Sequence, residues 1–201
     1  VLASRNEGKV AEIAEIMEGV ADVRPLSVYG DVVLPPEDGA TYEENAYAKA
    51  AATVRALGLP SLADDSGLEV EALGGRPGVL SNRYAGDGGN VANNAKLLAA
   101  LRSIPPAARR ARFVCVAVLV LPGGGSFTSR GEVEGTIACQ LRGDGGFGYD
   151  PLFVPDGHRN TFAEMSAADK NAVSHRRRAF DAMAGIITEL IRYGRWPSLG
   201  G

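Results

Sequence analysis

The sequence predicts an α/β fold in which helices cover a mixed central β-sheet. Strand-like and helix-like segments alternate through the first half of the chain, which is typical of α/β proteins. The run 113–121 is continuously apolar and rich in valine, as expected of a strand buried on both faces. With 45% apolar residues in 201, the chain can build a substantial core, and no linker or repeat divides it. We therefore expect one domain, residues 1–201.

The N-terminal segment predicts a strand, a tight loop and a helix. Residues 1–3 are apolar and residues 4–9 are polar. Apolar side chains then recur at helical spacing between residues 10 and 17. A second strand is expected within residues 20–28, before a proline-containing loop.

The next helix has sequence signals at both ends. Thr41 and Glu44 match a capping box, in which the hydroxyl and the carboxylate each accept a hydrogen bond from the backbone of the first turn. An alanine-rich segment follows, and Gly58 predicts its end. A helix is therefore expected over residues 41–57.

The rest of the chain predicts strands and two further helices. Three strands are expected beside the central run, at 61–64, at 68–73 and within 127–139. Asn90 is expected to cap a helix that ends before Pro105. Ser174 is expected to cap the last helix, whose apolar stripe stops before Gly194.

Composition excludes several classes of protein. A formal net charge of −3 gives no general attraction for a polyanion, so nucleic acid is not an expected partner and any anion site must be local. The longest apolar run is far shorter than the roughly 20 residues of a membrane helix, and the N-terminus lacks a signal-peptide pattern. Cys115 and Cys139 have neither metal-ligand nor disulfide-framework spacing. We expect a cytoplasmic protein with reduced cysteines.

Two adjacent carboxylates, Asp64 and Asp65, end a strand-like apolar run. Successive side chains of a regular strand point to opposite faces, so these two residues are expected to have different roles. Taken alone, the pair is also typical of a solvated strand end or of an Asx-type turn. Features elsewhere in the chain favour a functional site.

Cations stand at two predicted helix starts. Lys9 follows the potential cap Asn6, and Arg176, Arg177 and Arg178 occupy the first turn of the last helix. A cation there opposes the helix dipole by about 0.3–1 kcal/mol, unless an anion binds the helix start and the cation together. Two such placements favour an anion site, although a solvated side chain accounts for Lys9 alone.

Lys49 lies among alanines in the predicted helix 41–57, with Asn45 one turn earlier on the same face. The small neighbours allow another segment to approach the ammonium group closely. An exposed lysine is the commoner situation, but the pairing with Asn45 favours a position that faces a site.

The stretch 143–148 matches the pattern G-x-G-x-x-G. In dinucleotide-binding folds this pattern opens a helix, whereas here Pro151 follows and favours an extended or turn-like backbone. We expect the glycines to let the backbone approach a flat ligand on which Phe147 or Tyr149 stacks. A β-bulge with core aromatics is the alternative.

Five segments occur in the order of a known family: SRNEGK, TYEENAYAKA, ADDSGLEVEALGGRPG, GGFGYDPLF and KNAVSHR. On these motifs the chain resembles the non-canonical purine nucleoside triphosphate pyrophosphatases over nearly its whole length. The resemblance implies an elongated α/β fold with two lobes around a substrate cleft, a homodimer and a Mg²⁺ cofactor. It also implies hydrolysis of ITP, dITP or XTP to the monophosphate and pyrophosphate, which removes them from the nucleotide pool.

The resemblance further implies roles for individual residues. Asp65 is the expected metal-binding carboxylate and proton acceptor, and Lys49 is the expected catalytic lysine on the phosphate side. Glu37, or Asp38 in the same loosely aligned loop, is the expected second metal ligand. The implied substrate-binding residues are Ser4, Arg5, Asn6, Glu7, Gly8, Lys9, Ser66, Phe147, Gly148, Tyr149, Asp150, Lys170, His175 and Arg176.

These roles predict a mechanism. Asp65 is expected to hold Mg²⁺ and to orient a water toward the α-phosphorus, while Asp64 points to the other face or pairs with Lys49. Arg176, which only donates hydrogen bonds, is expected to face the 6-keto oxygen of hypoxanthine or xanthine and to reject adenine. The alternatives are a related pyrophosphatase acting on modified pyrimidine nucleotides, a non-catalytic nucleotide or RNA sensor, and an oxidoreductase that uses the glycine run.

Overall fold

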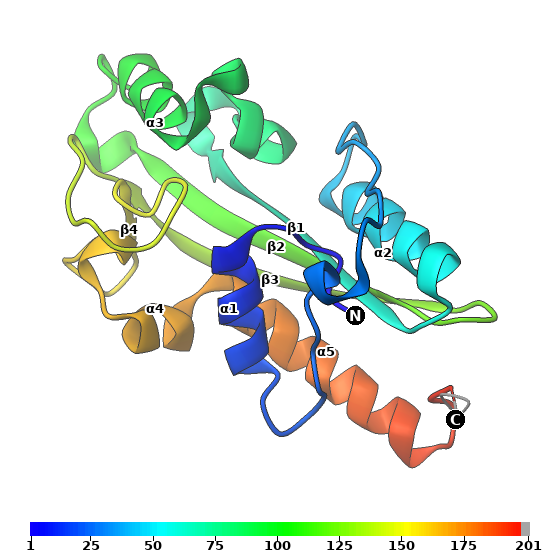
Figure 1. The fold of residues 1–201 in the computed structure, drawn as a ribbon. Coiled ribbons are helices and arrows are strands. Elements are labelled where there is room, and N and C mark those ends of the chain that lie inside the picture. The colour runs from blue at the N-terminus through cyan, green and yellow to red at the C-terminus, as the bar shows by residue number, and fades with distance from the viewer. Residues whose placement is uncertain (198–201) are drawn as a thin grey trace. The chain divides into compact units, whose positions relative to one another are not determined.

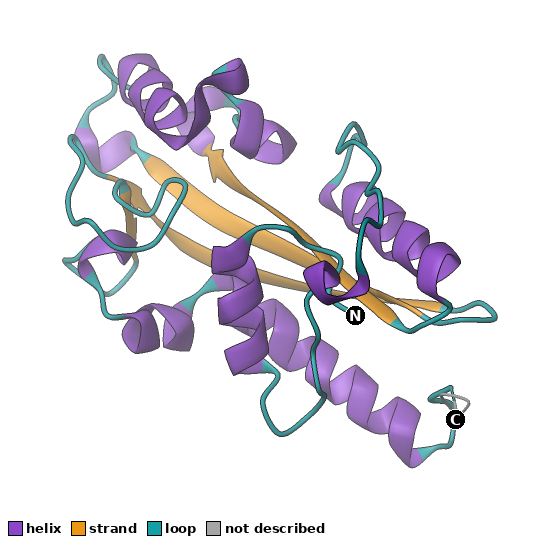
Figure 2. Cartoon of the chain, viewed as in Figure 1, coloured by secondary structure: helices purple, strands orange, loops and turns teal. Residues whose placement is uncertain are grey.

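The fold is built on a four-stranded sheet of order β1-β2-β3-β4 within residues 1–197, the part of the chain that the computed structural model describes (Figure 1). The strands are β1 Ser61–Val70, β2 Arg110–Val120, β3 Ser126–Ile137 and β4 Phe153–Pro155. The α-helices are α1 Glu7–Ile16, α2 Tyr42–Leu57, α3 Gly89–Ala100, α4 Ala167–Val173 and α5 His175–Arg192. Figure 2 shows both element types along the chain, which confirms the predicted α/β class. Residues 198–201 of the expected domain lie outside the described residues.

The continuous apolar run forms the interior of the sheet, as predicted. Every residue from Phe113 to Leu121 is buried, and β2 has β1 on one side and β3 on the other. The glycines at 123–125 all have positive φ angles, so they allow the short turn from β2 into β3. β3 pairs antiparallel with β4, with Thr136 opposite Val154.

The two strands predicted at 61–64 and 68–73 are a single strand. β1 continues from Ser61 to Val70, because the backbone stays extended through both aspartates and the glycine that follows them. Residues 71–73 then leave the sheet as a 3-10 helix. This continuity preserves the alternation of side chains at the two aspartates.

The two N-terminal strands are much shorter than predicted. Leu2 makes only single-residue parallel bridges, to Leu62 and to Pro25. The strand expected within 20–28 stops there, because proline has no N–H to donate and Leu26–Tyr29 forms a 3-10 helix. Together with the antiparallel β3–β4 pair, these bridges give the sheet its mixed character.

Helix ends follow the sequence signals in most cases. The Asn6 side chain accepts a hydrogen bond from the third N–H of α1 (3.0 Å), and Thr41 does the same at α2 (3.1 Å). Gly58 ends α2 with a φ angle of 66°. The prediction for α3 is wrong, because that helix begins at Gly89 and Asn90 lies inside it.

The last part of the chain contains a helix that the sequence analysis did not predict. α4 ends at Val173, and the next residue, Ser174, has an extended backbone (φ −70°, ψ 153°). α5 therefore begins at His175, directly after Ser174, as expected for the long final helix.

The chain forms two compact units, each with its own hydrophobic core. Unit 1 comprises Val1–Asp65, Cys115–Gly131 and the chain from Arg176 onward, and unit 2 comprises Ser66–Val114 and Glu132–His175. The single domain 1–201 and the substrate cleft between two lobes stay predictions.

In unit 1, the helices α1 and α5 share one core. Ile13 of α1 belongs to the same cluster of buried residues as Phe180 and Met183 of α5, and the two helices are adjacent in Figure 1. The core of unit 2 is aromatic. The Phe113 ring lies 4.8 Å from that of Phe153, measured between ring centroids, and Phe162 completes the group.

Arg109 stabilises unit 2 as a buried cap at the end of α3. Its guanidinium donates to the carbonyl oxygens of Leu101 (2.8 Å), Ile104 (2.9 Å) and Ala138 (3.4 Å). Replacing Arg109 by methionine is expected to lower the free energy of unfolding by about 2–4 kcal/mol, because it leaves buried carbonyls without donors. Urea unfolding measures the loss. The matched control is Arg102→Met, at an exposed arginine, which is expected to cost under about 0.5 kcal/mol. Equal losses in the two variants would contradict the assigned role.

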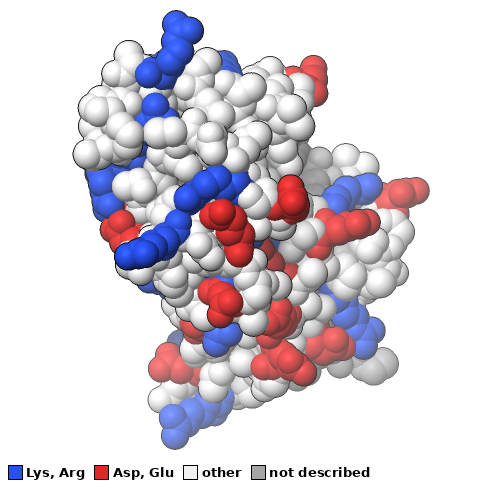
Figure 3. All heavy atoms as spheres, turned by 90° about the vertical axis from the view of Figure 1, so that its left-hand side faces the viewer, with Lys and Arg blue, Asp and Glu red and all other residues white. Residues whose placement is uncertain are grey.

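The surface is not uniformly basic. On the face shown in Figure 3, acidic and basic side chains are interspersed, in keeping with a net charge of −3. An anion site must therefore be built locally from a few side chains. Among the described residues, no helix is both long enough and apolar enough to cross a membrane.

Candidate active site

Asp64 and Asp65 lie side by side in β1 and are almost fully buried, with 1% and 2% of their surface exposed. Burying adjacent carboxylates is costly unless each is paired or hydrogen-bonded. The two side chains have different partners, as the alternation of a strand predicts. Asp64 contacts cations, and Asp65 is held by an amide.

Asp64 is the centre of a buried ion cluster in unit 1. Its Oδ2 lies 3.0 Å from Nζ of Lys9 and 3.5 Å from Nε of Arg176. Burial raises the pKa of Asp64, but the positive charges of Lys9, Arg176 and Lys49 outweigh it and hold the pKa well below its ordinary value. Asp64 is therefore a charged carboxylate that organises cations, and it is a poor proton acceptor.

Asp65 is held in place by Asn45 of α2. The Asn45 amide nitrogen donates to Oδ2 of Asp65 (2.8 Å), and the amide oxygen accepts from the N–H of Gly39 (2.8 Å). Burial raises the pKa of Asp65, and the charge of Glu37 adds to this rise against the opposing lysine charges. Asp65 is thus oriented by its neighbours and is a stronger base than an ordinary aspartate.

Lys49 joins the site one turn after Asn45 on α2. Its Nζ donates to the main-chain oxygen of Asp64 (2.7 Å) and forms an ion pair with Glu37. Burial lowers the pKa of Lys49, but the charges of Asp64, Glu37 and Asp65 outweigh it and raise the pKa overall. Asn45 was not among the predicted site residues. Its four-residue spacing from Lys49 is the signal that identifies it.

The carboxylates of Glu37 and Asp65 fit a Mg²⁺ ion that is bound together with phosphates. Both interact electrostatically with the same ammonium group, that of Lys49, and the Glu37 side chain is 27% exposed. Within residues 1–197, no group of three or more His, Cys, Asp or Glu could hold a metal ion. Mg²⁺ commonly uses one or two carboxylates, several waters and phosphate oxygens, so a pair is sufficient. The alternative ligand Asp38 is exposed.

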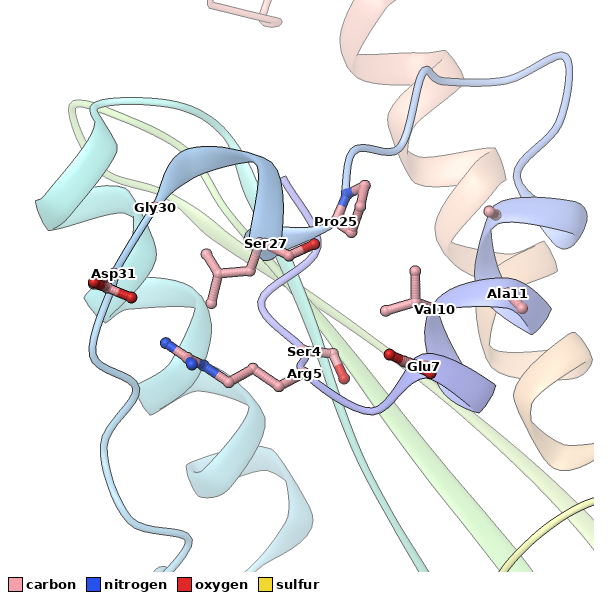
Figure 4. Close-up of a pocket in the computed structure, with 11 residues that line it drawn as sticks. Ser4, Arg5, Glu7, Val10, Ala11, Pro25, Ser27, Gly30 and Asp31 are labelled. Atoms are coloured by element: carbon pink, nitrogen blue, oxygen red, sulfur yellow. The ribbon is translucent and has the colours of Figure 1, made fainter.

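The segment Ser4–Lys9, which includes the first turn of α1, directs its side chains to different places. Lys9 reaches Asp64, whereas Ser4, Arg5 and Glu7 line a cavity of about 530 Å³ beside the 3-10 helix Leu26–Tyr29 (Figure 4). Neither of the two aspartates of β1 lines this cavity. The structure therefore brings Lys9 to the aspartates, and it places these three predicted substrate-binding residues elsewhere in unit 1.

Two further residues of this segment belong to the start of α1. The Asn6 side chain caps the helix, and Gly8 is its second residue. Arg5 extends toward the loop at Asp31 in Figure 4 and donates to the main-chain oxygen of Val32 (2.9 Å). Their predicted contacts with substrate stay predictions.

Arg176 lies in unit 1, as do Lys9 and Lys49. Its guanidinium pairs with Glu12 of α1, in addition to the contact with Asp64. Burial lowers the pKa of Arg176, but these two carboxylates raise it above its ordinary value. A fully buried guanidinium needs such partners. The predicted contact of Arg176 with a 6-keto oxygen stays a prediction.

The predicted base-binding segment Phe147–Asp150 belongs to unit 2. Asp150 is buried and accepts hydrogen bonds from the N–H of Phe147 (2.8 Å) and from Nζ of Lys170 (2.7 Å). The same ammonium lies 4.7 Å from the centroid of the Phe147 ring, within the range of cation–π attraction. A Cβ on Gly146 would lie 2.1 Å from the Asp150 carboxylate, so this close approach requires glycine. Asp150 and Lys170 thus hold the glycine-rich loop around Phe147.

Phe147, not Tyr149, presents the more exposed ring. Tyr149 is buried, and its hydroxyl donates to the main-chain oxygen of Ser81 (2.9 Å). Burial also raises the pKa of Tyr149. Phe147 is only half-buried, so it is the better candidate for stacking on a flat ligand. The stretch 143–148 does not open a helix. This confirms the expectation from Pro151 and differs from the glycine motif of dinucleotide-binding folds.

Two other predicted substrate-binding residues occupy contrasting positions. His175 is buried, and its ring stacks on Phe113 with centroids 4.7 Å apart and an interplanar angle of 9°. It therefore packs in the aromatic core of unit 2. Ser66 directly follows Asp65 in β1 and is half-buried. Contacts of either residue with substrate stay predictions.

The fold and this site define an α/β protein with a cluster of buried cations beside a buried carboxylate of raised pKa. The chain belongs to the Ham1 family, whose model matches residues 1–186. Its fold is therefore that of a known family, and the motifs named above lie within the matched range.

Relatives and solved structures agree with this assignment. The chain is 55% identical to a dITP/XTP pyrophosphatase of Syntrophobacter fumaroxidans, over 89% of this chain and 77% of that protein. It is 53% identical to a dITP/XTP pyrophosphatase of Nocardia farcinica, over 89% of each. The structure of a HAM1 protein from Coxiella burnetii matches with a TM-score of 0.85 and 39% identity, over 94% of this chain and 97% of that one.

Proposed function

We propose that this protein hydrolyses the non-canonical purine nucleoside triphosphates dITP, ITP and XTP to the nucleoside monophosphate and pyrophosphate. The names of its relatives support this activity. The observation that carries the proposal is the buried Asp65 carboxylate, held by Asn45 and neighboured by the cations Lys49 and Lys9. A base among cations suits phosphoryl transfer, which depends on positioning and on charge neutralisation.

The phosphate side of the reaction belongs to unit 1. Lys9 and Lys49 bind the triphosphate and neutralise the charge that develops on the leaving pyrophosphate. Asp64 keeps Lys9 in position for this role. Binding of phosphate also offsets the unfavourable placement of Lys9 in the first turn of α1.

Asp65 acts as the proton acceptor for the attacking water. Its raised pKa makes it a suitable base, and its bond to Asn45 keeps the second carboxylate oxygen in a constant orientation. A Mg²⁺ ion held by Glu37 and Asp65 supplies charge neutralisation for the phosphates when bound. Lys49 neutralises the same two carboxylates through its ammonium group.

Phe147 in unit 2 stacks on the base. Lys170 and Asp150 hold this ring in place and present donor and acceptor groups beside it.

In line with the family resemblance, we also propose that the enzyme is a homodimer of the cytoplasm. Light scattering on purified protein measures the mass and tests the dimer.

Product analysis tests the proposed function. The protein is incubated with Mg²⁺ and with dITP, ITP, XTP, GTP or a modified uridine triphosphate, and the products are separated by ion-exchange chromatography. We expect monophosphate and pyrophosphate from the first three. Diphosphate with phosphate would contradict the reaction. Preferred turnover of the uridine nucleotide indicates the pyrimidine-specific alternative, and binding without turnover indicates a sensor.

A further inference from the structure

Two adjacent asparagines of α3, Asn93 and Asn94, are buried in unit 2, with 2% and 5% of their surface exposed. Asparagine is a weak helix former, and a buried amide is costly unless it is hydrogen-bonded. Each of these residues therefore needs an explanation from its contacts.

The two amides have different partners. Both ends of the Asn93 amide are bonded to one neighbouring backbone segment: its oxygen accepts from the N–H of Ala85 (2.7 Å), and its nitrogen donates to the main-chain oxygen of Asn82 (3.1 Å). Asn94 donates instead to the main-chain oxygen of Gly148 (2.9 Å), 54 residues away. Its own amide oxygen is buried with no hydrogen-bond partner within residues 1–197.

An apolar residue at position 94 would remove that unsatisfied oxygen. A residue that breaks a local rule of stability marks a candidate functional position. The one bond that Asn94 makes therefore identifies its role, and this bond leads to the glycine between Phe147 and Tyr149.

The bond to Asn94 restrains Gly148, which has no side chain of its own to limit its backbone conformation. Gly148 has a φ angle of 62°. A Cβ added to it would have no atom within 4 Å, so no neighbouring group packs against this side of the backbone. The segment is also held at the residues on either side of Gly148. The N–H of Phe147 donates to the Asp150 carboxylate, and the hydroxyl of Tyr149 donates to the main-chain oxygen of Ser81. The Asn94 bond completes this set of restraints by fixing the peptide that follows Gly148.

We propose that Asn94 is a positioning residue that sets the Phe147 ring against the purine base by holding Gly148. The proposal rests on the proposed function, in which Phe147 stacks on the base. Asn94 acts through the backbone and makes no contact with the phosphates. Its effect should therefore be confined to ligands that carry a base.

The test compares Asn94→Leu with the matched control Asn93→Leu. Losing the restraint on Gly148 is expected to raise the KM for ITP about three- to tenfold, the effect of one hydrogen bond, with little change in kcat. Inorganic tripolyphosphate, which has no base, is expected to inhibit Asn94→Leu as it inhibits the wild type. Asn93→Leu is expected to keep the wild-type KM, because its bonds lead to residues 82 and 85. Asn94→Ala replaces the leucine variant if leucine does not fit.

Hydrogen exchange gives a readout that does not depend on catalysis. The amides of residues 147–150 are expected to exchange faster in Asn94→Leu and to be unchanged in Asn93→Leu. A wild-type KM with unchanged exchange in Asn94→Leu would overturn the proposal, as would an equal loss of ITP and tripolyphosphate binding. Failure of the wild type to release pyrophosphate would reject the proposed function instead, and faster exchange at 147–150 would still support the restraint.

Discussion

Asp65→Asn is expected to lower kcat on the order of a thousandfold, the typical contribution of a positioned general base. Asparagine has the shape of aspartate and its side-chain oxygen still accepts from Asn45, so the fold should be unchanged. It lacks the negative charge and the basicity that the buried carboxylate of Asp65 provides. Pyrophosphate release from ITP with saturating Mg²⁺ measures the effect, and thermal unfolding checks that the variant is folded.

The control for this variant is Glu69→Gln, which neutralises another carboxylate of β1. Glu69 pairs with Arg112 in unit 2 and has no part in the proposed mechanism, so its replacement should leave kcat within about twofold of the wild type. A near wild-type kcat in Asp65→Asn would show that Asp65 is not the general base. The proposed mechanism would then be wrong.

Asp64→Asn is expected to destabilise the protein by about 3–5 kcal/mol, the usual cost of removing one partner of a buried ion pair. Lys9 and Arg176 both contact this carboxylate and are themselves buried. The neutral amide leaves their charges poorly compensated. Urea unfolding at neutral pH measures the loss of stability.

A matched control is Asp156→Asn, which removes the partner of Arg110 at an exposed ion pair and should cost no more than about 1 kcal/mol. In a second arm, Lys9→Met added to Asp64→Asn should restore part of the lost stability, because it removes one uncompensated charge. A loss under about 1 kcal/mol for Asp64→Asn would show that Asp64 does not organise the cations.

The adjacent aspartates Asp64 and Asp65 show which features of the site the sequence alone could predict. Strand alternation predicted that Asp64 and Asp65 have different roles. The structure gives their side chains different partners, and the roles stay a prediction. Strand alternation did not predict which partners they have. The suggested pairing of Asp64 with Lys49 involves the main-chain oxygen of Asp64, whereas its carboxylate meets Lys9 and Arg176.

Burial favours one of two alternatives that the sequence left open. Either Phe147 or Tyr149 suited a flat ligand by sequence, and the hydroxyl of Tyr149 is committed to Ser81 within the core. Asn94 carried no sequence signal at all. An asparagine inside a helix does not reveal whether its amide reaches solvent or a loop distant in the sequence.

By itself, the sequence determined the α/β class, the apolar centre of the sheet, the caps of α1 and α2 and the family motifs, because these depend on periodicity and on residues close together in the chain. Only the tertiary structure decided which groups meet. The bond from Asn45 to Asp65 joins residues 20 apart, and the pair of Glu12 and Arg176 joins residues 164 apart. Contacts of this kind, and the balance of burial and neighbouring charge that lowers the pKa of Asp64 and raises that of Asp65, arise only when distant segments pack together.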